Sequence, residues 1–312
     1  MTGQMLLFPG QGSQEKGMGR DLAEHNSEIM ELWKKAEKIS KLPLREICWD
    51  GDQENMSPTN ILQPALTVVN LSLLISIKNK INPIAASGHS LGEFSALVAT
   101  GILSIDDVLA TTSLRGKLMA EADPNNNGSM AAILKLSEDK VKDIVKEVND
   151  ENHGFLIVAN YNTPSQFVVS GDKNAVNIAC QKAKEQKGRG LELKVSGAFH
   201  SPMMKEANKE FAILLNKCTW NNAKFPLYSN IDGKPVIDAE KAKENILNQM
   251  ISSVLWIDTM KNSYNNGIRS YLELGPKSVL SKMVSQCLSS ISNAENSIEV
   301  KTVTNLEDIG AY

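Results

Sequence analysis

The sequence lacks most of the features that mark metalloproteins, disulfide-stabilised proteins and membrane proteins. Its 312 residues contain four cysteines that lie far apart and form no C-x-x-C pair: Cys48, Cys180, Cys218 and Cys287. This spacing predicts reduced core thiols rather than a metal site or a disulfide framework. The four histidines show no metal-ligand spacing either. No uninterrupted run of 18 apolar residues occurs, which argues against a membrane span.

The sequence also lacks an excess of charge and a secretory signal. Lysine and arginine number 33 against 36 aspartates and glutamates, so the net charge of −3 gives no sign of nucleic-acid binding. The chain runs directly into an apolar segment at residues 4–8, without the positively charged region that begins a signal peptide. We therefore expect a cytoplasmic protein with one large domain, or a large domain and a smaller one.

The pentapeptide GHSLG at residues 88–92 fits the G-x-S-x-G pattern of a nucleophile elbow. In such a turn a serine, here Ser90, lies between a strand and a helix, and its hydroxyl projects away from the backbone. The context agrees, because residues 83–86 can form a short buried strand and residues 91–100 an apolar helix closed by Gly101. The alternative is a glycine-flanked helix start in which the serine is only the N-cap.

Two other loops carry groups that could complete a site. An apolar run ends in the sequence PGQGSQ at residues 9–14, which either presents backbone N–H groups to a ligand or forms an ordinary turn. It matches neither the phosphate-binding loop nor the dinucleotide pattern. His200 lies in a short loop before Pro202 and could approach Ser90, although a lone loop histidine is more often a surface residue. His89, next to the serine, should point away from it and be structural.

The helix predicted for residues 104–122 contains an anomaly. Its apolar stripe passes through Val108 and Thr112, and Arg115 falls within that stripe. Arginine is rarely buried without a partner, because an uncompensated guanidinium is strongly destabilising. Its stem could extend to solvent, or it could form an internal salt bridge to an acid such as Glu93. The functional alternative is a planar fork that binds a substrate carboxylate through two parallel hydrogen bonds.

The order of predicted elements indicates an inserted subdomain after the linker DPNNNG. From there the pattern runs β-α-β-β-α-β, which is the split ferredoxin-like unit. Its predicted strands are residues 129–134, 155–159, 166–170 and 190–195, and its predicted helices are residues 137–148 and 174–187. Elsewhere, helices are expected at residues 18–39, 59–78, 240–250 and 256–264, a short strand at 226–229, and a final parallel strand at 271–274.

Strands and helices that alternate on both sides of the insert imply a mostly parallel sheet covered on both faces. We therefore predict an α/β protein with a hydrolase-like large subdomain, formed by residues 1–126 and 197–312. The ferredoxin-like small subdomain is expected to span residues 127–196.

The motifs in combination resemble the malonyl-CoA:acyl carrier protein transacylase family. The likeness covers nearly the whole chain, and the motifs occur in the order and spacing of that family. They are FPGQGSQ at residues 8–14, QPA at 63–65, GHSLGE at 88–93, Arg115-Gly116 with Met119, and GAFHS at 197–201. Each motif is weak alone, but the joint pattern is highly specific. The resemblance implies a transferase that requires no metal or redox cofactor.

The resemblance also implies a role for each matched residue. Ser90 is expected to be the nucleophile that accepts the acyl group as an ester. His200 is expected to be the base that takes its proton and later activates the incoming thiol. The main-chain N–H groups of Gln11 and Leu91 would form the oxyanion hole. Arg115 would bind the free carboxylate of the malonyl group.

Two further residues match supporting positions. The backbone carbonyl of Gln249 is expected to orient the histidine in place of a carboxylate. Phe199 resembles the malonyl-selective form, because a bulky ring before the histidine leaves little room for a branched methyl. One departure lies nearby: the family usually has a proline, then valine and, two residues on, tryptophan, whereas residues 253–256 read SVLW. The backbone restraint of that proline is therefore missing.

The sequence thus predicts a ping-pong transfer in which malonyl-CoA acylates the serine, CoA leaves, and the phosphopantetheine thiol of acyl carrier protein attacks the ester. Basic residues from Lys182 to Arg189 are a candidate dock for an acidic carrier. The resemblance favours a monomer, and the charge balance and the lack of a long apolar run indicate no nucleic-acid or membrane partner. The acceptor could instead serve a polyketide synthase.

Two rival functions remain. One is a G-x-S-x-G hydrolase, which the position of the last histidine, His200, disfavours, because α/β-hydrolases place theirs near the C-terminus. A carboxylate clamp at Arg115 would also be of no use to a simple acyl hydrolase. The other is a non-catalytic carrier-docking module, which would not need Ser90 and His200 together.

Overall fold

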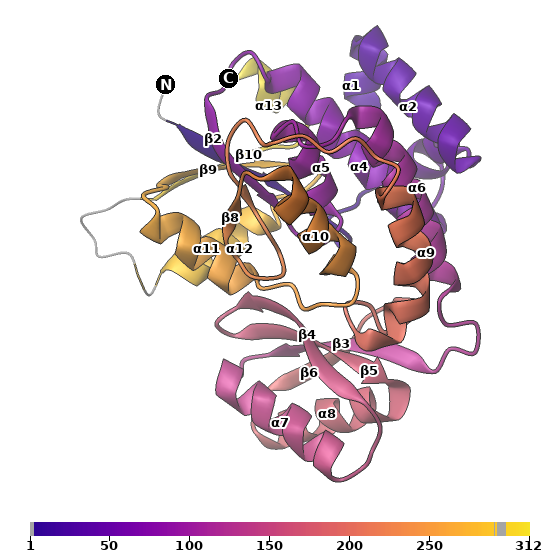
Figure 1. Ribbon diagram of the computed structural model, residues 1–312, viewed down its shortest axis with the longest axis vertical. Coiled ribbons are helices and arrows are strands. Elements are labelled where there is room, and N and C mark those ends of the chain that lie inside the picture. The colour runs from indigo at the N-terminus through magenta and orange to yellow at the C-terminus, as the bar shows by residue number, and fades with distance from the viewer. Residues whose placement is uncertain (1–2, 290, 292–297) are drawn as a thin grey trace.

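A six-stranded sheet forms the centre of the large subdomain (Figure 1). In this computed structural model, the described residues are 3–289, 291 and 298–312. The strands of the sheet are β1 (Gln4–Phe8), β2 (Pro83–Gly88), β7 (Leu227–Tyr228), β8 (Pro235–Val236), β9 (Ser270–Leu274) and β10 (Glu299–Val303). They lie in the order β10-β9-β1-β2-β7-β8, and all neighbours are parallel except β7 and β8. The predicted α/β class and mostly parallel sheet are confirmed.

Strand β1 is buried along its whole length, as expected for a parallel strand covered on both faces. Leu6 and Phe8 belong to one core cluster and Met5 and Leu7 to another, because successive side chains point to opposite faces. The first cluster is covered by α1 (Arg20–His25), α2 (Ser27–Ser40), α4 (Thr59–Ile77), α5 (Gly92–Ala99), α6 (Ile105–Glu121), α9 (Lys205–Leu215), α10 (Ala239–Gln249) and α13 (Leu306–Gly310). The second contains residues of α11 (Trp256–Asn265) and α12 (Leu280–Leu288) and continues into the small subdomain.

One predicted helix of this subdomain is wrong, and one predicted strand, 271–274, is present as β9 but is not the last. The single helix expected at residues 18–39 is two helices, because Asn26 between them has extended backbone, with φ −132° and ψ 116°. Its side chain accepts a 2.8 Å hydrogen bond from Glu28 N and so caps α2. The strand expected to be the last is followed by β10, which pairs with β9 at the edge of the sheet. This edge strand is fully buried only at Val303, so its sequence carries little apolar pattern.

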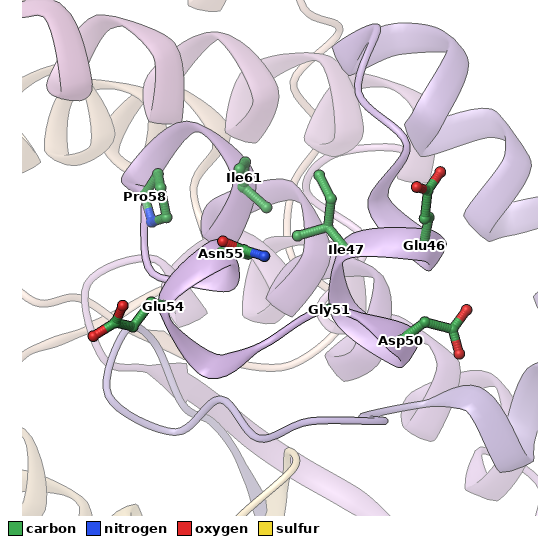
Figure 2. Close-up of a pocket in the computed structure, with 8 residues that line it drawn as sticks. All are labelled: Glu46, Ile47, Asp50, Gly51, Glu54, Asn55, Pro58 and Ile61. Atoms are coloured by element: carbon green, nitrogen blue, oxygen red, sulfur yellow. The ribbon is translucent and has the colours of Figure 1, made fainter.

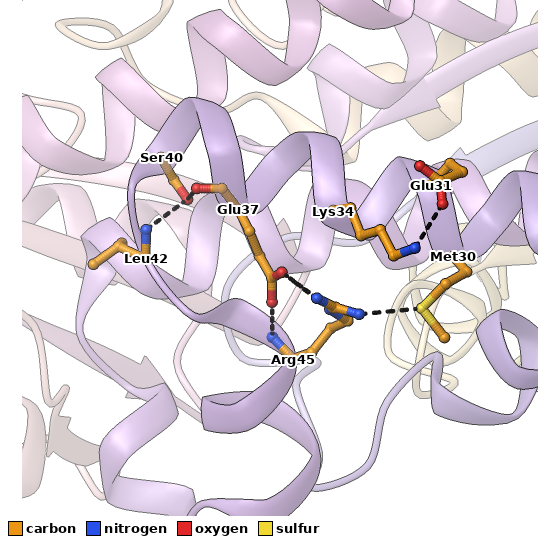
Figure 3. A network of polar contacts seen from close by, with 7 residues as sticks. All are labelled: Met30, Glu31, Lys34, Glu37, Ser40, Leu42 and Arg45. Atoms are coloured by element: carbon orange, nitrogen blue, oxygen red, sulfur yellow. Dashed lines mark hydrogen bonds and ion pairs between the residues drawn. The ribbon is translucent and has the colours of Figure 1, made fainter.

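The end of α2 is tied to the next turn by an arginine (Figure 3). Arg45 Nε and Nη2 donate to Glu37 Oε2 at 3.0 and 2.7 Å, and Arg45 N donates to Glu37 Oε1 at 2.9 Å. This two-sided contact fixes the start of the π-helix η1 (Glu46–Asp50) and the short helix α3 (Gln53–Met56) that lead into α4.

Helix α4 is the central apolar helix of the large subdomain. By length and composition alone it could cross a membrane, but 72% of its most apolar 18-residue stretch is buried inside the protein, where it packs on α5 and α6. A mostly buried core helix can be as long and as apolar as a membrane-spanning helix. Within the described chain all four cysteines are free; Cys48 and Cys287 are buried, whereas Cys180 and Cys218 are half-buried rather than fully in the core.

The small subdomain contains a separate antiparallel sheet with the order β4-β5-β3-β6. Its elements follow one another as β3 (Gly128–Leu134), α7 (Glu138–Asp150), β4 (Leu156–Thr163), β5 (Gln166–Asp172), α8 (Lys173–Glu185) and β6 (Arg189–Glu192). Figure 1 shows the two helices on the face of this sheet that is turned away from the large subdomain.

The two subdomains are joined by more than their connecting chains. Strand β4 packs against α11 and α12, and Asn160 forms a parallel β-bridge with Val254. In that bridge Tyr161 N donates to Val254 O at 2.9 Å, and Val254 N donates to Ala159 O at 2.8 Å. The segment between α10 and α11 is therefore held by the small sheet.

Candidate active site

The GHSLG segment forms the sharp strand-to-helix turn that the sequence predicts. Ser90 has a φ of +51°, in the left-handed region, between the end of β2 and the start of α5. A Cβ on Gly92 would lie 1.8 Å from Phe8 O, and a Cβ on Gly88 would lie 2.0 Å from the Gly92 carbonyl carbon. Only glycine fits at both positions, because any side chain would displace the backbone of β1 or of the turn itself. The serine is thus held as in a nucleophile elbow.

His200 lies directly beside this serine. Ser90 Oγ donates to His200 Nε2 at 2.7 Å, although 110 residues separate them. The histidine also has a left-handed backbone, with φ +54°, and the turn around it is held by Ser201 Oγ, which donates to Ala198 O at 2.6 Å. The loop histidine is therefore part of a serine–histidine pair, and the alternative of an isolated surface histidine is wrong.

The other ring nitrogen of His200 faces two backbone carbonyls. Its Nδ1 lies 3.1 Å from Gln249 O and 3.1 Å from Ser252 O, so the proton on the ring resides at Nδ1 and leaves Nε2 as the acceptor. Burial, and next the positive charge of Arg115, lower the pKa of His200 to about 3, while the two carbonyls raise it. The ring is consequently neutral, which is the form that can accept a proton from Ser90.

Arg115 is 1% exposed and contacts the hydroxyl of Ser90. Its Nη2 donates to Ser90 Oγ at 3.3 Å and to Gln249 Oε1 at 3.0 Å, and its Nη1 donates to Gln63 Oε1 at 2.9 Å. The guanidinium also lies 5.5 Å from the centre of the Phe94 ring, within range of a cation–π contact. Among the described residues it has no ion pair, and its Nε has no hydrogen-bond partner.

The buried arginine is therefore not neutralised by direct contact with an acid. The salt bridge to Glu93, one of the alternatives from sequence, is not formed; the side chain of Gln249 stands between the two, with its Nε2 donating to Glu93 Oε2 at 2.7 Å. Burial lowers the pKa of Arg115 to about 10, and the charge of Glu93 opposes that shift. The charge of Glu93 therefore acts on the guanidinium across one amide side chain and not through a salt bridge.

Backbone N–H groups are available where the oxyanion hole is expected. Phe8 and Gly88 are paired at the carboxyl ends of β1 and β2, which brings the loop at residues 9–14 next to the elbow. A Cβ on Gly10 would lie 3.5 Å from Leu91 N. In the part of the chain that the structure describes, the N–H groups of Gln11 and Leu91 donate to no protein acceptor. Both are free to bind a ligand oxygen.

The two remaining residues from the sequence prediction are buried near this site. Phe199 precedes the histidine and is 4% exposed, and its carbonyl accepts a 2.7 Å hydrogen bond from Ser170 Oγ of the small sheet. His89 points away from the Ser90–His200 pair, as expected: its Nε2 lies 2.7 Å from Asn162 Oδ1, and its ring packs edge-on against Trp256.

Sequence reasoning did not find three groups that shape the site. Asn230, after β7, accepts from Ser90 N at 2.7 Å with its Oδ1 and donates to Gly88 O at 2.7 Å with its Nδ2. Ser252 supplies a second carbonyl to the histidine, and the side chain of Gln249 reaches the arginine. None follows a recognisable motif, since each acts through a contact between segments far apart in the sequence.

A separate cavity of about 590 Å³ lies between η1, α3 and the start of α4 (Figure 2). None of the site residues lines it. Its lining includes the carboxylates of Glu46, Asp50 and Glu54 with the apolar side chains of Ile47 and Ile61. Three carboxylates make this cavity unsuited to an anion such as the phosphates of CoA. In the described ranges no group of three His, Cys, Asp or Glu side chains is placed to hold a metal ion.

The fold and the serine–histidine pair belong to an acyl transferase domain, because the family model of that domain matches residues 5–306 of this chain. A malonyl CoA-acyl carrier protein transacylase of Staphylococcus aureus (strain MW2) is 34% identical over 313 residues, covering 100% of this chain and 99% of that protein. The chain belongs to the malonyl-CoA:acyl carrier protein transacylase family, as its motifs predict.

Solved structures agree with this assignment. FabD from Acinetobacter baumannii has a TM-score of 0.90 and 32% identity, over 99% of this chain and 96% of that one. A malonyl-transacylase solved in complex with a type II polyketide-synthase acyl carrier protein has a TM-score of 0.91 and 29% identity, over 99% of this chain and 98% of that one.

Proposed function

We propose that this chain transfers a malonyl group from malonyl-CoA to the phosphopantetheine thiol of acyl carrier protein, through an ester on Ser90. The observation that carries this proposal is the position of Arg115, a buried cation 3.3 Å from the Ser90 hydroxyl that contacts no acid among the described residues. A malonyl group attached to Ser90 has its free carboxylate a few bonds from the ester. The arginine is therefore placed to bind that carboxylate while the serine reacts.

The first half-reaction follows from the contacts of Ser90. Its Oγ attacks the thioester carbonyl of malonyl-CoA, and its proton moves to His200 Nε2. Negative charge develops on the carbonyl oxygen, where the N–H groups of Gln11 and Leu91 would stabilise it; loss of one such donor typically costs about 3–4 kcal/mol. The carbon–sulfur bond then breaks, and the departing CoA sulfur takes the proton from Nε2.

The second half-reaction uses the same groups in reverse. The carrier thiol gives its proton to His200 Nε2 and attacks the ester carbonyl. When the intermediate collapses, the carbon–oxygen bond breaks and Ser90 Oγ takes the proton back. The two carbonyls at Nδ1 stabilise the imidazolium that forms in each half, in the place of a carboxylate. Phe199, beside the histidine, would limit the room for a branched acyl group.

Fewer basic residues of the segment from Lys182 to Arg189 are available to bind an acidic carrier protein than the sequence suggests. Lys182 is already paired with Glu147 and Glu151 of α7, both at 3.1 Å, so its charge is largely compensated. Lys184, Lys187 and Arg189 are exposed and remain the basic residues of this segment offered to a carrier. We further propose that the enzyme acts as a cytoplasmic monomer; sedimentation of the purified chain tests its oligomeric state.

The test is intact-mass analysis of the protein after incubation with malonyl-CoA. The expected result is one malonyl adduct, mapped to Ser90 by peptide sequencing and lost when acyl carrier protein is added. Ser90→Ala should give no adduct. Free malonate and CoA without an adduct would refute the proposed transfer and favour a hydrolase, and a label on another residue would refute the role of Ser90.

A further inference from the structure

Gln249 links three groups of the site through its side chain. Its Nε2 donates both to Ser90 O, at 2.9 Å, and to Glu93 Oε2, at 2.7 Å, and its Oε1 accepts from Arg115 Nη2 at 3.0 Å. Both amide protons are used, and the residue is 1% exposed. Solvent therefore does not compete for these contacts.

Glu93 decides which way that amide points. Its carboxylate only accepts hydrogen bonds: Oε1 accepts from Asn230 N at 3.1 Å, and Oε2 accepts from the Gln249 amide. Rotating the amide by half a turn would place its oxygen against a carboxylate oxygen and its NH₂ against the Arg115 guanidinium. Both contacts would be repulsive, so the acid holds the amide oxygen towards the arginine.

The same arrangement sets the distance between the two buried charges. Glu93 is 1% exposed and belongs to the first turn of α5, while Arg115 comes from α6. One amide separates the carboxylate from the guanidinium, so each charge compensates the other without direct contact. Burial raises the pKa of Glu93 to about 7, and the amide of Gln249 and the charge of Arg115 act in the opposite direction.

We propose that Glu93 is a positioning residue for the malonyl carboxylate: through the amide of Gln249 it holds Arg115 beside Ser90 and leaves the guanidinium open to the substrate. A glutamate in direct contact with Arg115 would fill the fork and compete with malonyl. Without an acid, the cation would be buried uncompensated and the amide free to turn. The inference rests on the proposed malonyl transfer and names a group that does not itself touch the substrate.

Glu93→Gln tests this role with the smallest change in shape. An amide at position 93 has one acceptor oxygen for two donors, so either Asn230 N or the Gln249 amide faces another NH₂. We expect kcat/KM for malonyl-CoA to fall about ten- to hundredfold, the range for a lost hydrogen bond to a charged group. Acylation by acetyl-CoA, which has no carboxylate for Arg115, should change much less, so the malonyl-to-acetyl ratio should fall.

A matched control is available in Glu273, another fully buried glutamate. Its carboxylate accepts from Leu280 N at 2.9 Å and Ser281 N at 2.7 Å, at the start of α12. Glu273→Gln should lower the melting temperature and leave the malonyl-to-acetyl ratio unchanged. This variant separates the loss of any buried carboxylate from the loss of the one at Arg115.

The double variant Glu93→Gln/Gln249→Glu retains the negative charge but places it against Arg115. It should fold, because the charges still balance, and it should remain poor with malonyl-CoA, because the fork is now occupied. It also keeps the test decisive if Glu93→Gln alone fails to fold. A role in stability only would instead restore malonyl transfer together with the melting temperature.

The outcomes are distinct. A wild-type protein that forms no malonyl adduct refutes the proposed function, whatever residue 93 does. A wild type that forms the adduct, with a Glu93→Gln variant that keeps the malonyl-to-acetyl ratio, overturns the positioning role alone. A ratio that falls in Glu93→Gln, holds in Glu273→Gln and stays low in the double variant supports it.

Discussion

Ser253 Oγ donates a 2.7 Å hydrogen bond to the main-chain oxygen of Val158, and this bond joins the segment that orients His200 to strand β4. The next residue, Val254, forms the β-bridge to Asn160, and the preceding one, Ser252, supplies a carbonyl to the histidine. Ser253 stands where the family usually has a proline. A side-chain hydrogen bond thus provides a restraint of the kind that a proline ring gives through the backbone.

Ser253→Ala and Ser253→Pro separate these two kinds of restraint. The alanine variant loses the bond to Val158 O, worth about 0.5–1.5 kcal/mol, so kcat should fall several-fold with little change in KM. The proline variant should keep the wild-type kcat, because Ser253 N donates to no acceptor within the described chain and proline removes only that N–H. Steady-state kinetics of both variants decides; a proline variant as impaired as the alanine one would show that the hydroxyl itself is needed.

Arg115→Ala should change substrate preference more than general activity. The variant loses the cation that would bind the malonyl carboxylate, worth about 1.5–3 kcal/mol for a charged hydrogen bond. Acylation of Ser90 should therefore shift strongly from malonyl-CoA to acetyl-CoA, measured by competition between the two and intact mass. Arg115→Lys keeps the charge but not the fork and should give an intermediate ratio. An unchanged ratio in the alanine variant would remove the carboxylate-binding role.

Asn230→Ala should destabilise the turn that holds Ser90. The amide of Asn230 bonds Ser90 N and Gly88 O, and without it the left-handed backbone of the serine loses its support. Each buried group left unpaired costs about 1–3 kcal/mol, so the melting temperature and kcat should both fall.

The matched control for Asn230→Ala is Asn149→Ala. Asn149 makes the same two kinds of backbone contact to Leu156, at 2.9 Å each, but in the small subdomain. That variant should lower the melting temperature and leave kcat near that of the wild type. An equal fall of kcat in both variants would point to general loosening of the fold.

The acid limb of the pH profile should report Glu93 rather than His200. Burial holds the pKa of Glu93 at about 7 and that of His200 at about 3, and Arg115 on α6 is the charged group that faces Glu93. As pH falls through about 7, Glu93 takes up a proton and no longer holds the amide of Gln249, so kcat/KM for malonyl-CoA should decrease. Glu93→Gln should be slow at every pH and lack this limb. A limb that persists in that variant would assign it to another group.

Much of the site could be predicted from sequence because its chemistry is local. Gly88 and Gly92 are required because Phe8 O and the backbone of the turn lie too close for a side chain. The G-x-S-x-G pattern therefore has a steric cause that can be recognised in the sequence. Arg115 was noticeable because a charge in an apolar stripe conflicts with burial. His200 could be proposed but not placed, since its contact with Ser90 joins residues 110 positions apart.

What the sequence could not reveal depends on contacts between distant segments. Every residue has a backbone carbonyl, so the sequence at position 249 does not reveal which carbonyl faces His200. Only the fold shows that the Gln249 side chain also contacts Arg115 and Glu93. In the sequence Asn26 looks like any polar residue on the surface of one long helix, and only the structure shows that its extended backbone separates α1 from α2. Strand β10 gains its place from pairing with β9, which no short polar segment reveals by itself.

The bridge between β4 and Val254 has a consequence for how the protein can be divided. Ser90, His200 and Arg115 all lie outside residues 127–196, so a chain without the insert would keep every side chain proposed to react. It would lose the strand against which the segment carrying the histidine's carbonyls rests. The insert thus supports the segment that holds the His200 ring, and we expect that excising it would leave Ser90, Arg115 and His200 in the chain but His200 no longer aligned with Ser90.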